Sequence, residues 1–402
     1  MSIYRQFGIE PIINAAGTLT RLGGAVMPDA VIEAMKLAAQ STVLIEELQA
    51  AGSRVLARLT QTEAGLITAG ASAGLTLGAA AILAGNNVER INRLPETEGF
   101  ANEFLIAIDQ RNGYDHAVRA AGARLVNIGM NEKVAGSGVR GVERADYAMG
   151  LSERTAGVLY VYRDGASPTL REVVAWAHEH RLPVMVDAAA ELSRRAHLHE
   201  IPSTGADLIA FSGGKAIRGP QSTGILCGKR DLIESAAMQM LDLDLDRRDW
   251  SPPTDLIDPD RWPAIPRHGI GRSLKVAKEQ MVGLLVAAEL FAQGIDPATR
   301  QTLDQRRARM VDLLRRKSLS ATVGSDDGDE PGPILIPVDS PSQAATIVRS
   351  LRAGRPAVYA RCNEARTHLA LNLSCVRAEQ ENVLIDRVKD AYSALDSEES
   401  RE

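Results

Sequence analysis

The segment Phe211-Ser-Gly-Gly-Lys-Ala-Ile-Arg-Gly-Pro-Gln221 decides how the rest of the chain is interpreted. Its single lysine, Lys215, stands on a glycine-rich turn that follows the apolar run 208–211. Upstream, Pro183-Val-Met-Val-Asp187 has the pattern of a short buried strand that ends in a carboxylate. A lysine and an aspartate at the ends of neighbouring strands suit pyridoxal phosphate (PLP), because the lysine forms a Schiff base and the carboxylate keeps the pyridine nitrogen protonated. A flexible surface lysine is the alternative, but the small residues around Lys215 leave room for a bulky adduct and favour the cofactor.

The composition predicts a globular chain of about two domains. The 402 residues are 45% apolar and carry a net charge of -5, and about 150 residues is a common domain size. The charge is spread along the chain, without the basic blocks typical of nucleic-acid or membrane binding. We expect a cytoplasmic protein with free thiols, since the three cysteines lack CxxC spacing, the N-terminus lacks a signal sequence, and no apolar run is long enough to cross a membrane.

A second glycine-rich segment, 70–74, follows the apolar run 64–68 and precedes an alanine-rich helix. Backbone N–H groups at a helix N-terminus attract anions. Ala71, Ser72 and Ala73 are therefore candidates to bind the PLP phosphate, and the Ser72 hydroxyl would add a donor. An ordinary helix cap is the alternative, and the Gly-Lys-Ser/Thr of a Walker loop is missing. The pairing with the Lys215 segment favours phosphate.

Short apolar strands alternate with helices through residues 60–230, which predicts an α/β fold with a mostly parallel sheet covered on both faces. Expected strands include 104–109, 124–128, 157–162 and 224–228. His116 lies just after the first of these, near a carboxyl end where open α/β sheets bind ligands. We favour His116 as the ring that stacks on PLP, with Arg111 as its rival.

The remaining segments predict an arm at residues 1–24, a large PLP-binding domain at 25–272, and a connecting helix with a small α+β domain at 273–402. The arm gathers Asn14, Thr18 and Thr20 beside apolar residues, which hints at a buried polar site and makes them candidate substrate-binding residues. The proline-rich stretch 240–272 is a long loop, as at functional sites or subunit contacts. It ends at Gly271, a candidate cofactor-binding residue, and at Arg272. We expect these two residues and the arm to cross a subunit boundary.

The segment 211–226, FSGGKAIRGPQSTGIL, resembles the PLP-lysine segment of the selenocysteine synthase (seryl-tRNA selenium transferase) family, which includes D-glucosaminate-6-phosphate ammonia-lyase. The segments 13–18, 114–122, 186–190 and 269–279 also resemble the ammonia-lyase side, so that the resemblance covers about residues 5–390. It implies a fold type I, aminotransferase-like architecture and a homodimer or larger assembly.

The resemblance also implies roles for individual residues. Lys215 would be the Schiff-base lysine and Asp187, with Ala189 close by, the partner of the pyridine ring. Ser72 and Ser212 would bind the phosphate, and Arg361 a substrate carboxylate; an ion pair at a domain interface is the alternative for Arg361. Selenocysteine synthase has an extra N-terminal segment for its tRNA, whereas this chain begins almost directly at the arm, so we expect no tRNA partner.

The leading functional hypothesis is a PLP-dependent α,β-elimination that converts an amino sugar acid or 3-hydroxy amino acid to a 2-keto acid and ammonia. Lys215 would take the Cα proton, and His116, Lys215 or His268 would protonate the leaving hydroxyl. A phosphorylated substrate would require further cations, for which Arg21, Arg218 and Arg272 are candidates. The alternatives are racemisation or epimerisation, aldol cleavage, and a non-catalytic protein with the same fold.

Overall fold

The computed structural model describes residues 2–130, 142–294, 297–326 and 328–399. The chain forms two compact units, which we call the large and small units. The large unit is Met27–Ala292, and the small unit combines Met1–Val26 with Gln293–Glu402. No helix in the described part of the chain is both long and apolar enough to cross a bilayer.

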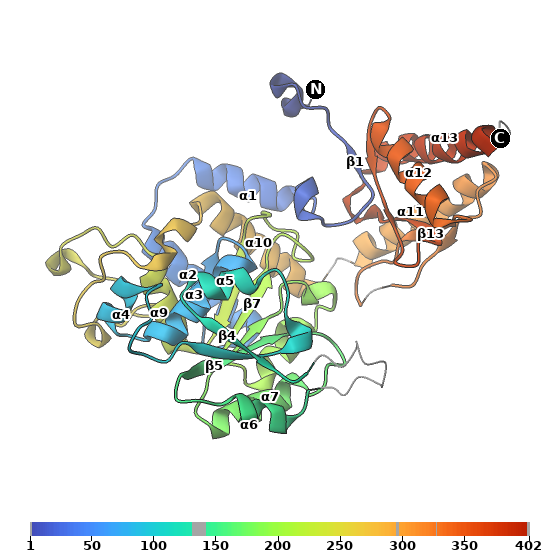
Figure 1. The fold of residues 1–402 in the computed structure, drawn as a ribbon. Helices are drawn as coiled ribbons and strands as arrows, with labels where there is room; N and C mark the ends of the chain where they lie inside the picture. Colours follow the sequence, from blue (N-terminus) through green and yellow to red (C-terminus); the bar gives the residue numbers. More distant parts are fainter. Residues whose placement is uncertain (1, 131–141, 295–296, 327, 400–402) are drawn as a thin grey trace. The chain divides into compact units, whose positions relative to one another are not determined.

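The large unit is built on a seven-stranded sheet with the order β2-β8-β7-β6-β5-β3-β4 (Figure 1). Its strands pair in parallel, except that β8 runs antiparallel to both of its neighbours. The predicted α/β class with a mostly parallel sheet is therefore confirmed. The strands are β2 (Ala64–Thr68), β3 (Glu103–Ala107), β4 (Arg124–Ile128), β5 (Thr155–Val161), β6 (Val184–Asp187), β7 (Leu208–Ser212) and β8 (Gly224–Gly228).

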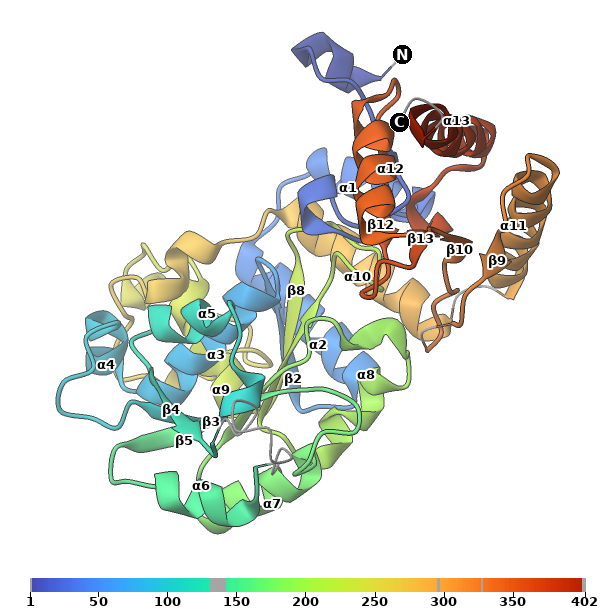
Figure 2. The same ribbon diagram turned by 45° about the vertical axis from the view of Figure 1, so that its right-hand side comes forward.

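Helices cover both faces of this sheet (Figure 2). On one face, the sheet residues Leu66, Met185 and Leu226 pack with helices α3 (Ala71–Ala84), α4 (Val88–Arg93), α5 (Asp115–Ala120) and α9 (Arg230–Met240). On the other face, Ile67, Val186 and Ile225 pack with α2 (Ile45–Thr60), α6 (Arg144–Gly150), α7 (Leu170–Glu179), α8 (His197–Glu200) and α10 (Lys278–Gln293). Successive residues along a strand thus point to opposite faces of the sheet. Because both faces are buried, the sequences of these strands are continuous apolar runs. Helix α1 (Asp29–Ala39) completes the unit.

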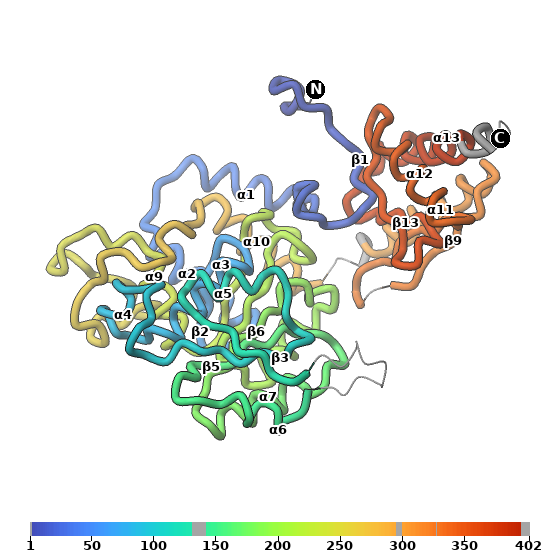
Figure 3. Tube along the Cα trace, viewed as in Figure 1, coloured from blue at the N-terminus to red at the C-terminus, as the bar shows by residue number. Residues whose placement is uncertain are grey.

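The small unit has a four-stranded antiparallel sheet with the order β12-β13-β10-β9. Its elements are α11 (Pro297–Arg316), β9 (Thr322–Val323), β10 (Ile334–Pro337), α12 (Pro341–Ala353), β11 (Val358–Tyr359), β12 (Arg361–Cys362), β13 (His368–Leu371) and α13 (Glu381–Glu399). Strand β1 (Ile13–Asn14) pairs in parallel with β11, and the tube view shows it beside the C-terminal segments (Figure 3).

The structure divides the chain at other points than the sequence predicts. The N-terminal arm is part of the small unit, because Ile13 and Ala15 are buried in that unit's core. Helix α10 is part of the large unit, because Met281 and Leu284 pack in its core. Both segments are apolar on one side, and periodicity alone does not say which core an apolar side joins. The short strand β9 is exposed and was not predicted.

Candidate cofactor-binding and active site

Five chain segments of the large unit meet at one edge of the sheet. Asp187 is the last residue of β6 and lies opposite Val161 of β5 and Ala210 of β7. Ser212, the last residue of β7, pairs with Gly224 at the start of β8, and Gly224 also pairs with the end of β2. The parallel strands all end here, and in open α/β sheets this is the edge at which ligands bind.

Asp187 carries a buried carboxyl group, with 8% of the residue exposed. Burial raises the pKa of the Asp187 carboxyl, whereas the backbone N–H of Ala189, which donates to Oδ1 over 3.1 Å, and the positive charge of Lys215 act to lower it. A buried carboxylate is costly unless a cation faces it. A protonated pyridine nitrogen would provide that cation, so the environment of Asp187 fits the pyridine end of PLP.

Lys215 stands on a compact turn that follows β7. The N–H of Gly213 donates to Thr223 O and the N–H of Gly219 to Gly213 O, both over 2.8 Å, and the N–H of Arg218 donates to Lys215 O over 2.9 Å. A Cβ at Gly214 would lie 2.4 Å from the Cα of Gln221, so the fold of the turn requires glycine there. Lys215 itself is partly exposed and free to meet a ligand.

The N-terminus of α3 lies at the same edge, because only two residues separate the end of β2 from the start of α3. Gly70 precedes the helix with φ 91° and no side chain caps it, so the N–H groups of Ala71, Ser72 and Ala73 can bind an anion. The side chain of Ser72 is exposed. A Cβ at Gly224 would lie 2.4 Å from the carbonyl carbon of Gly70, so the absence of that atom lets β8 approach the helix start.

His116 and Arg111 differ in how they are held. His116 is exposed on α5, and the hydroxyl of Thr76 ties α5 to α3 by donating to Ala117 O over 2.8 Å. Arg111 donates to the Asp115 carboxylate over 2.6 Å and also bonds Asn127. Since the Arg111 guanidinium is engaged, this arrangement favours His116 as the ring that would stack on the cofactor.

Three further predicted residues lie in the large unit. Gly271 is buried in the 3-10 helix Ile270–Leu274, which packs on α3 and α9. Arg272 forms an ion pair with Asp242, so it is not an unpaired cation for a substrate. His268 is exposed and lines a separate cavity with residues 243–246 and 265–267.

The small unit holds the predicted substrate residues Asn14, Thr18, Thr20 and Arg361, whereas Arg218 lies on the Lys215 turn of the large unit. The side chain of Asn14 forms hydrogen bonds within the arm. Its N–H donates to Gly17 O, and its Oδ1 accepts from the N–H of Ala16, each over 3.0 Å. Thr18 lies on the loop that follows β1, and Thr20 begins the short 3-10 helix Thr20–Leu22. Arg361 begins β12 and is exposed. The predicted cofactor residues thus all lie in the large unit, and Asn14, Thr18, Thr20 and Arg361 lie in the small one.

Sequence reasoning missed a polar cluster beside Asp187. The N–H of Tyr162 donates to Asp187 O over 2.9 Å, and its hydroxyl donates to Asp164 over 3.0 Å. Asp164 also accepts from Arg194 and lies 3.3 Å from Nε2 of the buried His197. Burial and the bond to Asp164 raise the pKa of Tyr162 to about 12, so its hydroxyl keeps its proton. The signal was present, since Tyr162 is the last residue of a predicted strand and Asp164 lies two residues after it.

The fold and this edge define a class: a fold type I, PLP-dependent enzyme. The family model described as L-seryl-tRNA selenium transferase (SelA) matches residues 12–247. The chain belongs to this family.

Curated relatives resemble nearly the whole chain. A 5'-C-glycyluridine monooxygenase-decarboxylase of Streptomyces sp is 31% identical over 89% of this chain and 84% of its own length. The D-glucosaminate-6-phosphate ammonia lyase of Salmonella typhimurium is 28% identical over 90% of this chain and 89% of its own. A solved structure of D-glucosaminate-6-phosphate ammonia-lyase has a TM-score of 0.78 at 24% identity and covers 98% of this chain and 99% of that chain, which shows the fold.

PLP is the cofactor of this family, and the residues present fit it. A phosphate requires an open set of N–H donors, which the start of α3 supplies. The pyridine nitrogen requires a buried carboxylate, and Asp187 provides one. The aldehyde carbon of PLP requires an accessible lysine amine. Lys215 is partly exposed and lies on the turn that follows β7, the strand next to β6.

Proposed function

We propose that this chain releases ammonia by α,β-elimination from an amino sugar acid or 3-hydroxy amino acid related to D-glucosaminate 6-phosphate, leaving a 2-keto acid. The observation that carries the proposal is the edge of the sheet where Lys215, the buried Asp187 and the uncapped start of α3 come together. The similarity to an ammonia lyase over 90% of the chain supports the choice of reaction.

When bound, PLP supplies an electron sink for the pair released at the substrate's Cα. Asp187 would hold the proton on the pyridine nitrogen, because its buried carboxylate gains most from a facing cation. The N–H groups of residues 71–73 would fix the phosphate and so the position of the ring. Lys215 Nζ would take the proton from the substrate's Cα, and His116 would lie against the ring and could donate the proton to the leaving hydroxyl.

A second candidate reaction is decarboxylation at Cα, which the 31% identity to a monooxygenase-decarboxylase favours. The same Lys215 and Asp187 would serve it, because both reactions leave an electron pair on Cα and differ in the bond that breaks. Which bond breaks depends on the substrate's orientation. Racemisation would require a second base on the opposite side of Cα. Aldol cleavage would require a base that takes the proton of the substrate's 3-hydroxyl while the Cα–Cβ bond breaks.

The test is incubation of the PLP-loaded protein with D-glucosaminate 6-phosphate, with ammonia, 2-keto acid and carbon dioxide measured together. Ammonia and keto acid in equal amounts, both absent with the matched variant Lys215→Ala, are expected. Carbon dioxide without ammonia would replace the lyase by the decarboxylase. If D-glucosaminate 6-phosphate does not react, the same products are measured with a panel of D- and L-amino acids with and without a 3-hydroxyl. Inversion of the configuration at Cα without release of ammonia would refute the lyase.

We also propose that the protein assembles as a homodimer or larger oligomer. Supporting this, the arm exposes Ile3, Tyr4, Phe7 and Ile9, and the segment 43–45 exposes three further large apolar side chains. Exposed apolar groups of this kind mark protein interfaces. Light scattering during gel filtration measures the mass, and a monomer of 43.1 kDa at micromolar concentration would contradict the proposal.

A further inference from the structure

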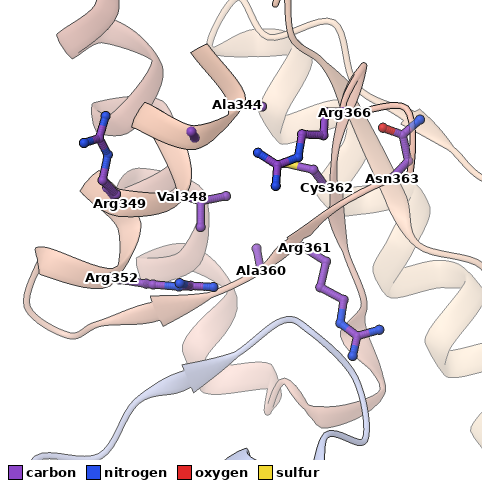
Figure 4. A pocket seen from close by; sticks show the side chains of 10 residues that line it. Ala344, Val348, Arg349, Arg352, Ala360, Arg361, Cys362, Asn363 and Arg366 are labelled. Atoms are coloured by element: carbon purple, nitrogen blue, oxygen red, sulfur yellow. The ribbon is translucent and has the colours of Figure 1, made fainter. Parts of the chain in front are cut away.

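A cavity of about 410 Å³ lies in the small unit between α12 and the hairpin of β12 and β13 (Figure 4). Four arginines line it: Arg349 and Arg352 from α12, Arg361 from β12, and Arg366 from the hairpin turn. In the close-up, Arg366 reaches back toward α12, whereas Arg361 points away from Arg366. Between the arginines, small apolar side chains form the floor: Ala344, Ala345, Val348 and Ala360.

These guanidinium groups lack carboxylate partners within the ranges that the structure describes: no ion pair is formed by Arg349, Arg352, Arg361 or Arg366. The sequence contributes to this, since the segment 340–363, which includes Arg349, Arg352 and Arg361, holds neither Asp nor Glu in a chain whose net charge is -5. Arg366 lies just beyond this segment, two residues after Glu364. Like charges around one cavity repel each other, and a bound polyanion would offset that cost. The cluster is therefore built for an anion.

Arg366 is positioned by the backbone of its turn, and Arg352 by contact with an aromatic ring. Arg366 has a left-handed φ of 52°, and its N–H donates to Asn363 O over 2.9 Å. The side chain of Asn363 closes the turn, because its Oδ1 accepts from the N–H groups of Thr367 and His368. On α12, Arg352 lies over the ring of Tyr359 at 5.4 Å, and Arg21 of the arm lies over the same ring at 6.0 Å.

We propose that this pocket binds the phosphate group of a phosphorylated small molecule. A phosphate dianion accepts several hydrogen bonds at once, and the planar guanidinium fork matches its oxygens. The cavity is larger than a phosphate alone, so the apolar floor would take the organic part of the ligand. The proposal goes beyond the proposed elimination, because the pocket is formed by the small unit alone, without Lys215 or Asp187.

The test is calorimetric titration of the PLP-loaded full chain with inorganic phosphate and with glycerol 3-phosphate. We compare the double variant Arg349→Gln/Arg366→Gln with the control Arg316→Gln, which removes an exposed arginine on α11 of the same unit. Each charged hydrogen bond lost should weaken binding about tenfold. We therefore expect the double variant to bind at least about tenfold more weakly and the control to bind like the wild type, with glycerol 3-phosphate held more tightly than phosphate.

The source of the phosphate is distinguished with D-glucosaminate 6-phosphate and D-glucosaminate. If the double variant loses affinity for the first and not the second, the pocket binds the phosphate of a substrate. If it keeps both affinities and loses glycerol 3-phosphate, a separate phosphorylated ligand occupies the pocket. The proposal is overturned if the wild type binds neither phosphate compound, or if the double variant, with an unchanged melting temperature, binds them like Arg316→Gln.

Discussion

The glycine at the start of β8 should control cofactor affinity. In Gly224→Ala, the new Cβ would lie 2.4 Å from the carbonyl carbon of Gly70 and 2.6 Å from the nitrogen of Ala71, whereas ordinary contacts begin at 3.4 Å. The start of α3 must therefore move by about 1 Å, the difference between the first and last distances. Overpacking of this kind costs about 1–3 kcal/mol of folding free energy.

The same movement should displace the N–H groups that would hold the phosphate. Losing one hydrogen bond to a charged group costs about 1.5–3 kcal/mol, which weakens PLP binding about 10- to 100-fold. The assay is titration of the apoprotein with PLP, followed by absorbance, with thermal unfolding measured in parallel. Gly113→Ala is the control, because a Cβ there meets no atom within 4 Å. A folded Gly224→Ala protein that binds PLP as tightly as the wild type would refute the phosphate site.

Three other substitutions test separate parts of the account. Burial raises the pKa of Asp187 in the folded state, so ionisation of this carboxyl destabilises the apoprotein as the pH rises. The variant Asp187→Asn should therefore have a higher melting temperature than the wild type at pH 7, and the difference should vanish below about pH 3.8. The variant should also lose activity. A melting temperature that is lower at pH 7 would contradict this. The variant Thr76→Val removes the hydrogen bond to Ala117 O and should lower the free energy of unfolding, measured with denaturant, by about 1–3 kcal/mol. It should also bind PLP more weakly. An unchanged free energy of unfolding would mean that other contacts hold α5 against α3. Glu381 is 1% exposed and forms ion pairs with Arg306, at 2.5 Å, and with Arg309. The variant Glu381→Gln should therefore lower the free energy of unfolding by about 3–5 kcal/mol and leave the affinity for PLP unchanged. A loss below about 1 kcal/mol would show that these charges are solvated.

The sequence was sufficient to predict the sheet and the placement of Asp187 at its carboxyl-terminal edge, with Lys215 on the turn that follows β7. Asp187 and Lys215 each follow a short apolar run, and parallel strands bring such positions to one edge. The start of α3 was visible in the same way, because glycine and serine stand between an apolar run and a helix. These features are local in sequence, and a periodic pattern is enough to find them.

Other features depend on contacts between distant segments. The approach of Gly224 to Gly70 joins residues 154 positions apart, and nothing near either glycine indicates it. The arginine pocket requires α12 and the hairpin turn to face each other, so its arginines were scattered residues in the sequence. The unit boundaries were missed for the same reason, since the apolar sides of the arm and of α10 do not specify a core.

The covalent attachment of PLP tests the central claim most directly. The PLP-loaded protein is reduced with borohydride, digested, and analysed by mass spectrometry. The account predicts one modified peptide, with the cofactor on Lys215, and no modification in Lys215→Ala. Modification of a different lysine, or of none while the cofactor remains bound, would contradict the assignment of this edge as the active site.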